Sequence, residues 1–164
     1  MINEDRFLKS MARLKGIPGI RLRLVGSDRP VRVPVPENVH VETIGAVDHR
    51  QLMEEYSAAH ALLLLGPAER GRGWVPSKLE EYKATGRPIL SFSAPGGHLE
   101  HLIEDTPGAY AASETDPASL DLALRNVRND AIHQKSFRGE RPARSWTEVG
   151  TEASVLVANT LTKW

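Results

Sequence analysis

An uninterrupted apolar run, ALLLLG at 61–66, constrains the fold of this chain more than any other segment. A continuous run of this kind is typical of a central parallel strand that is covered on both faces. A second run, PILSFS at 88–93, has the same character. Segments with helical spacing alternate with these strands, as crossovers between parallel strands require. The sequence therefore predicts an α/β fold built on an open parallel sheet with helices on both faces.

The remaining elements follow from periodicity and from turn residues. Further strands are expected at 20–26, 39–45 and 109–113. Helices are expected at 2–14, 48–59, 77–86, 96–105, 116–130 and 146–162. The proline-rich stretch 27–38 is predicted to be a loop, and 136–145 to be irregular. Asp48 and Asp116 are the expected N-caps of their helices, and Pro117 suits the first position of the second one.

Composition limits the class of protein. A length of 164 residues corresponds to one domain, which we place at 1–164. Lysine plus arginine equals aspartate plus glutamate at 21 each, so nucleic acid is not an expected partner. The chain has no cysteine, which excludes disulfides and thiolate metal sites and suits the cytoplasm, where we expect the protein to be located. Its apolar runs are far too short for a transmembrane segment, and none is expected.

The segment VPSKLEEYKATGRPIL at 75–90 carries the most specific chemistry. Ser77 is a good N-cap, and Glu80 stands three residues later, where the reciprocal partner of a capping box belongs. Lys78 adds a full positive charge at the helix end where free amides attract a phosphate. Glu81 lies about 100° around the helix from Glu80, so it can serve a second role, such as accepting hydrogen bonds from a ribose. By spacing alone, a capped helix without any ligand fits the segment equally well.

The wider pattern around this segment resembles one protein family. The string PSKLEEYKATGRPIL resembles the signature helix of retaining glycosyltransferases of the GT-B fold, family 4 type. LRLVGS at 22–27, VETIGAVDHRQLMEEYSAAHALLLL at 41–65 and APGGHLEHLIEDTPGAYAASETDPASLDLAL at 94–124 are similar to the neighbouring stretches of that family, in the same order. The resemblance covers about Ile20 to Val127. It implies that the chain is the Rossmann-like C-terminal half of a GT-B enzyme.

The resemblance also implies site residues. Glu81 matches the family glutamate that holds the nucleotide ribose, and Ser77 and Lys78 match the residues at the diphosphate end of the helix. Ala46 and Val47, which follow Gly45, match the segment whose backbone contacts the base. Gly26 and Ser27 form a turn at another strand end that faces the same crevice. Each pair also has a simpler structural interpretation as a turn, and Tyr82 is expected to pack against the sheet.

The chain departs from the family pattern in three places. Many members carry another glutamate, near the donor sugar, at the position that Gly73 occupies here, and Glu69 replaces it only if the loop folds back. Family C-terminal domains open with a strand, a glycine-rich turn and basic residues, whereas this sequence opens at the following helix. The N-terminal domain that holds the acceptor is not part of the sequence.

The implied function is that of a donor-binding domain. The resemblance implies binding of a nucleoside diphosphate sugar, with no cofactor, and transfer of the sugar to a glycan or lipid-linked acceptor. That activity requires an N-terminal acceptor-binding domain or a partner subunit, so the chain alone is expected to be inactive, and its catalytic residues are not assigned. Two alternatives stay open: a non-catalytic nucleotide-binding or assembly module derived from the same fold, and half of a sugar-nucleotide epimerase.

Other motifs are weaker. His98 and His101 stand three residues apart beside Glu100 and lack a third ligand at a compatible spacing, so no metal site is expected. Arg70 and Arg72 lie in the loop at 66–74 and are expected to be solvated rather than bound to a phosphate. In the assembly-module alternative, the terminal segment from Trp146 to Trp164 docks on a partner.

Overall fold

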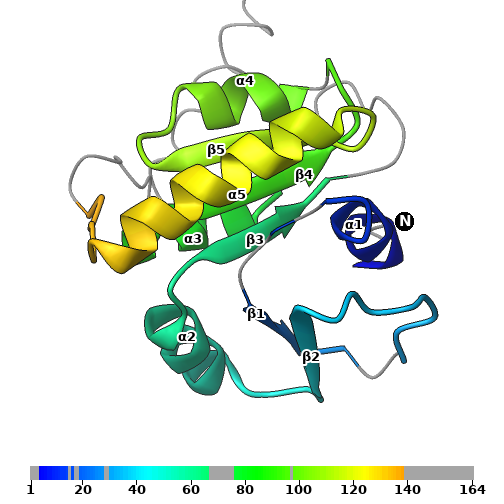
Figure 1. Ribbon diagram of the computed structural model, residues 1–164. Helices are drawn as coiled ribbons and strands as arrows, with labels where there is room; N and C mark the ends of the chain where they lie inside the picture. Colours follow the sequence, from blue (N-terminus) through cyan, green and yellow to red (C-terminus); the bar gives the residue numbers. More distant parts are fainter. Residues whose placement is uncertain are drawn as a thin grey trace, which may run out of the picture.

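The computed structural model describes residues 4–14, 16, 19–27, 30–66, 76–96 and 98–138 (Figure 1). Helices and strands alternate along this part of the chain. In chain order they are α1 (Glu4–Met11), β1 (Ile20–Val25), β2 (Val39–Ile44), α2 (His49–Ala58), β3 (Leu62–Leu65), α3 (Lys78–Thr85), β4 (Ile89–Ser93), α4 (His98–Glu104), β5 (Ala109–Ser113) and α5 (Pro117–Ile132). The predicted α/β class is therefore confirmed.

The strands form two parallel sheets rather than one continuous sheet. In the smaller sheet, β1 pairs with β2 from Ile20 opposite Val39 to Val25 opposite Ile44. In the larger sheet the order is β3, β4, β5, with Leu62 opposite Ile89 and Ile89 opposite Ala109. Figure 1 shows the β1 and β2 pair set apart from the larger sheet. The expected parallel pairing is present, but no backbone ladder joins β1 to β3 among the described residues.

Helices cover both faces of the larger sheet, because its central strands alternate their apolar side chains between two clusters. The first cluster packs α1 and α5 against one face. Its buried members are Phe7, Leu8, Met11, Val39, Leu90, Phe92, Ala112, Leu120, Ala123 and Val127. The second cluster packs α2, α3 and α4 against the other face. Its buried members are Tyr56, Leu62, Leu64, Leu79, Tyr82, Ile89, Leu99 and Ile103.

The β3 strand is less covered than the sequence suggests. Leu62 and Leu64 are buried in the second cluster, whereas Leu63 and Leu65 are only partly buried against the first. The neighbouring β4 is buried along its first four residues. The difference arises because β4 lies between two strands, whereas among the described strands only β4 pairs with β3. The expectation of full burial is thus right for β4 and only half right for β3.

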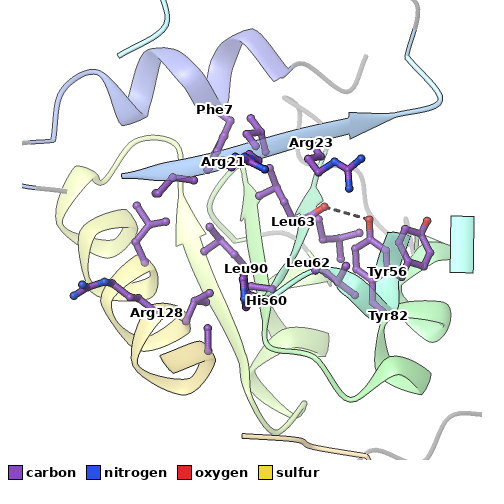
Figure 2. A pocket seen from close by; sticks show the side chains of 18 of the residues that line it. Phe7, Arg21, Arg23, Tyr56, His60, Leu62, Leu63, Tyr82, Leu90 and Arg128 are labelled. Carbon is purple, nitrogen blue, oxygen red and sulfur yellow. Dashed lines mark hydrogen bonds between the residues drawn. The ribbon is translucent and has the colours of Figure 1, made fainter. Parts of the chain in front are cut away.

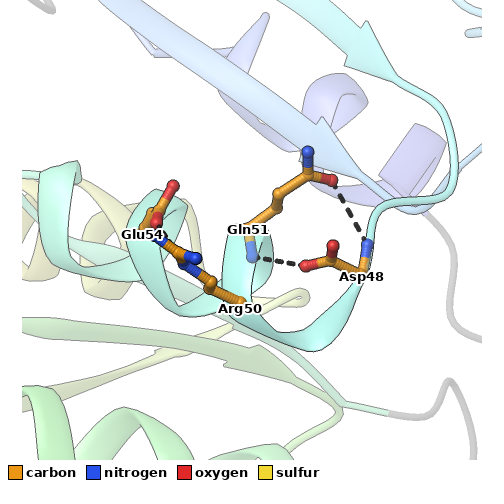
Figure 3. A network of polar contacts seen from close by, with 4 residues as sticks. All are labelled: Asp48, Arg50, Gln51 and Glu54. Carbon is orange, nitrogen blue, oxygen red and sulfur yellow. Dashed lines mark hydrogen bonds and ion pairs between the residues drawn. The ribbon is translucent and has the colours of Figure 1, made fainter.

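Two of the predicted helix caps are present. Asp48 accepts a hydrogen bond from the Gln51 amide at 2.8 Å, and the Gln51 side chain accepts one from the Asp48 amide, which completes a capping box at the start of α2 (Figure 3). At the start of α5, the Asp116 carboxylate accepts from the Ala118 amide at 2.9 Å. Both helices therefore begin where the sequence predicts, and in each the cap side chain bonds one amide of the first turn.

Several predictions fall partly or wholly outside the described residues. These are the first residues of the N-terminal helix, all of the 66–74 loop after Gly66, the end of the irregular stretch 136–145 and the helix at 146–162. The described part of that irregular stretch, 136–138, contains no helix or strand. In the described ranges, none of the helices is both long enough and apolar enough to cross a bilayer.

Candidate functional site

A cavity of about 1540 Å³ lies between β1 and β3 (Figure 2). The two strands form its walls along their whole lengths, from Ile20 to Val25 and from Leu62 to Leu65. The end of α2, one side of α3 and one side of α5 also line it, together with Glu4 and Phe7 of α1. Binding sites for small molecules typically measure roughly 300–1,000 Å³, so this cavity exceeds what one such ligand requires.

The walls of the cavity are mainly apolar and its rim carries arginines. Leu62, Leu63 and Leu90 line the interior, and Arg21 and Arg23 reach in from β1 (Figure 2). Arg23 pairs with Glu42 at 3.2 Å and with Glu55 at 2.6 Å, so its charge is already matched. Arg21 and Arg128 are exposed. The cavity therefore offers an apolar interior with positive charge at its edge.

Two tyrosines meet at the wall that α2 and α3 provide. The rings of Tyr56 and Tyr82 are 5.0 Å apart between centroids and cross at 83°. The Tyr82 hydroxyl donates to the Leu63 carbonyl at 3.3 Å (Figure 2). Burial, the neighbouring Tyr56 and the charge of Glu81 together raise the pKa of Tyr82. Tyr82 is thus a neutral donor to the β3 backbone at physiological pH, and the prediction that it packs against the sheet is confirmed.

The start of α3 differs from the predicted capping box. Ser77 has helical backbone angles, φ −55° and ψ −33°, and its side chain makes no capping hydrogen bond. The Glu80 carboxylate pairs with Lys83 at 3.0 Å instead of returning to Ser77. The capping-box prediction is wrong here because Ser77 already lies in the helical turn, where its hydroxyl does not face the first amides, and because Glu80 has a closer cation.

Lys78 is exposed at the first position of α3 and lines the cavity. The amides of Leu79 and Glu80 donate to the carbonyls of Pro76 and Ser77. Within the described part of the chain, the amides of Ser77 and Lys78 make no such bond. Among the described residues, this helix start therefore presents two amides without a backbone acceptor beside a lysine charge, a combination that attracts an anion.

Glu81 lies one turn into α3, beside the tyrosine pair. Its side chain is partly exposed and makes no hydrogen bond or ion pair with any residue that the structure describes. Its negative charge adds to burial in raising the pKa of Tyr56 as well as that of Tyr82. A carboxylate in this setting is an available acceptor for hydroxyl groups of a ligand.

Gly26 and Ser27 follow the carboxyl end of β1. Gly26 has φ +80°, a conformation that favours glycine, and its amide donates to the Ile44 carbonyl at 2.9 Å. Ser27 lines the same cavity as Lys78. The structure therefore brings two of the predicted site residues, Ser27 and Lys78, to one cavity at the carboxyl ends of parallel strands.

The other predicted residues do not reach the cavity lining. Ala46 and Val47 follow the carboxyl end of β2, exposed and partly exposed respectively, and neither they nor Ser77 nor Glu81 line the cavity. Glu81 directly precedes Tyr82, which does line the cavity.

The sequence analysis also named residues of the 66–74 loop and a pair of histidines. Glu69, Arg70, Arg72 and Gly73 lie outside the described residues. His101 contacts Glu104 at 3.4 Å, and the described ranges hold no cluster of three or more metal-ligating side chains. Sequence reasoning missed Tyr56 and the arginines of β1 as parts of a site, since their approach to α3 and β3 depends on how distant elements pack.

Comparison with known proteins adds no relative. No family model, no curated protein and no solved structure matches this chain.

Proposed function

We propose that this chain binds a nucleoside diphosphate sugar and forms the donor half of a retaining glycosyltransferase, which needs an acceptor-binding domain or subunit for turnover. The observation that carries the proposal is the convergence of Ser27 and the uncapped start of α3, with Lys78, on one cavity. Open α/β sheets bind ligands at the carboxyl ends of their strands. The proposal also rests on the sequence resemblance in the same helix.

The proposed roles of Glu81, Ala46 and Val47 come from the sequence resemblance, and that of Lys78 is also supported by the chemistry of the helix start. Lys78 and the free amides at the start of α3 neutralise the diphosphate, whose charge grows as it leaves the sugar. Glu81 accepts hydrogen bonds from the ribose hydroxyls, and the backbone of Ala46 and Val47 contacts the base. Transfer in this class depends mainly on positioning and on stabilising the leaving group. The donor half supplies some of these contacts, and the acceptor half supplies the nucleophile.

Calorimetric titration with UDP, GDP and ADP, and with the nucleosides as controls, tests this proposal. We expect one diphosphate to bind. Lys78→Ala and Glu81→Ala should each weaken binding by about 1.5–3 kcal/mol, roughly 10- to 150-fold, as removal of a charge-assisted hydrogen bond does. Lys9→Ala and Glu104→Ala are matched controls, because both residues are exposed and neither lines the cavity.

Two outcomes of the titration would contradict the proposed donor site. Absence of binding at millimolar nucleotide, or equal affinity in the wild type and the Lys78→Ala and Glu81→Ala variants, would refute the donor site. Selective binding that no acceptor domain converts into transfer would instead support the non-catalytic module.

A further inference from the structure

A tyrosine hydroxyl joins α3 to β3 beside the cavity. The Tyr82 hydroxyl donates to the Leu63 carbonyl at 3.3 Å, and both residues line the cavity (Figure 2). The Leu62 amide donates to the Pro88 carbonyl, and successive residues of a strand direct their backbone groups to opposite edges, so those of Leu63 point away from β4. Within the described ranges, no other hydrogen bond links α3 to β3. The Tyr82 hydroxyl therefore makes the directional contact between this helix and this strand.

The two ends of α3 are held differently. At the C-terminal end, the Gly86 carbonyl accepts from the Phe137 amide at 2.9 Å, and the Arg87 side chain donates to the Ser57 carbonyl at 2.6 Å. At the other end, Leu79 is fully buried in the second cluster, but the helix start has no side-chain cap. Apolar packing is non-directional, so it holds the start of α3 against the sheet without fixing where along β3 the helix lies.

Tyr82 lies one helical turn after Lys78. Residues four apart lie on the same face of a helix, about 6 Å apart along its axis, and both of these side chains line the cavity. The ring of Tyr82 is itself oriented by the edge-to-face contact with Tyr56, at 5.0 Å between centroids. Burial, more than any other cause, raises the pKa of Tyr82, so its hydroxyl stays protonated and remains a donor. An oriented donor thus lies on the same helix face as the lysine.

We propose that Tyr82 is a positioning residue for the diphosphate: its bond to the Leu63 carbonyl fixes α3 along β3 and thereby places the Lys78 ammonium where the anion binds. Binding sites keep their geometry when hydrogen bonds from a surrounding layer hold the elements that carry the ligand-binding groups. Tyr82 touches no phosphate in this role and acts only through Lys78. The inference rests on the proposed function and adds a residue to which the sequence resemblance gives no role in binding.

NMR titration with inorganic pyrophosphate, followed at the amide of residue 78, tests this role. The probe carries only the group that Lys78 is expected to bind, and NMR measures affinities into the millimolar range. Tyr82→Phe keeps the ring and removes the hydroxyl, so we expect it to weaken pyrophosphate binding about 3- to 10-fold, as the loss of one hydrogen bond does. In the Lys78→Ala background, Tyr82→Phe should have no further effect, because the group that it positions is gone.

Tyr110→Phe is the matched control. The Tyr110 hydroxyl also donates to a side chain inside the fold, that of Asp130, but Tyr110 lies on β5 and does not line the cavity. Its loss should lower the thermal stability of the protein and leave the pyrophosphate affinity unchanged, which separates a positioning role from a merely structural one.

Three results would overturn the inference while the donor site stands. These are equal affinity in the wild type and Tyr82→Phe, equal weakening by Tyr110→Phe, and a further loss from Tyr82→Phe in the Lys78→Ala background. If the wild type binds neither pyrophosphate nor any nucleoside diphosphate, the proposed donor site fails and this inference fails with it. The behaviour of the wild type therefore distinguishes the two failures.

Discussion

Helices α3 and α5 are anchored alike in the core but differ at their ends. At the start of α5 the Asp116 carboxylate accepts from the Ala118 amide, and at its other end the buried Asp130 accepts from the Tyr110 hydroxyl and pairs with Lys135 at 2.7 Å. The start of α3 has no side-chain cap. Both helices border the cavity, but α5 is capped at its start and bonded by neighbouring side chains at its end, whereas the first amides of α3 have no side-chain acceptor among the described residues.

The difference shows why similar sequence signals lead to different structures. Asp116 has an extended backbone, φ −124° and ψ 95°, so its carboxylate turns back to the amide two residues later. Ser77 has helical angles, so its hydroxyl does not. An uncapped helix start costs stability, and such a cost is commonly retained where donors are needed for a ligand.

The largest expected effect tests whether the two helices are anchored equally. Leu79 in α3 and Leu120 in α5 are both 0% exposed, so Leu79→Ala and Leu120→Ala should each lower the free energy of unfolding by about 2–5 kcal/mol. Urea denaturation measures both. Leu122→Ala, at a position 61% exposed, is the control and should change stability by less than about 0.5 kcal/mol. A much smaller loss for Leu79→Ala than for Leu120→Ala would mean that α3 as a whole, and not only its start, is weakly held.

A smaller effect separates the two helix starts. Asp116→Ala should lower the free energy of unfolding by about 0.5–2 kcal/mol, because the Ala118 amide loses its acceptor. Ser77→Ala should change it by less than about 0.5 kcal/mol, because no cap is lost. Thermal and urea unfolding of the two variants give the comparison directly. Equal losses would show that Ser77 does cap α3 in solution, and the contrast between the helices would disappear.

Much of the fold was predictable because it depends on local signals. The apolar runs around β3 and β4, and the caps Asp48 and Asp116, are short-range patterns with one physical solution. The cap at Ser77 was predicted wrongly because a Ser-x-x-Glu pattern does not reveal that Glu80 pairs with Lys83 instead of with the helix start.

The site was less predictable because it depends on distant contacts. Ser27 and Lys78 were expected at strand ends, and parallel topology does bring them to one cavity. The bond between Tyr82 and the Leu63 carbonyl joins residues 19 apart, and it depends on how α3 packs on β3 rather than on any spacing. The division of the strands into two sheets likewise depends on which strands pair with each other. The alternation of residues within one strand does not determine that pairing.

The smallest expected effect concerns the C-terminal end of α5 and depends on pH. Burial acts to raise the pKa of Asp130, but hydrogen bonds from Lys135 and Tyr110 outweigh it, and the pKa is lowered. A lowered pKa in the folded state stabilises the protein above the ordinary aspartate value, about 3.9, and this contribution is lost as the pH falls through the folded value. Lys135 is 51% exposed, so solvent screening keeps the effect small.

We expect the difference in unfolding free energy between wild type and Asp130→Asn to shrink below about pH 4 in urea titrations, with the exposed Asp105→Asn as control. A difference that stays constant with pH would mean that packing, rather than the ionised carboxylate, closes this end of α5, and the two helices would then differ only at their starts.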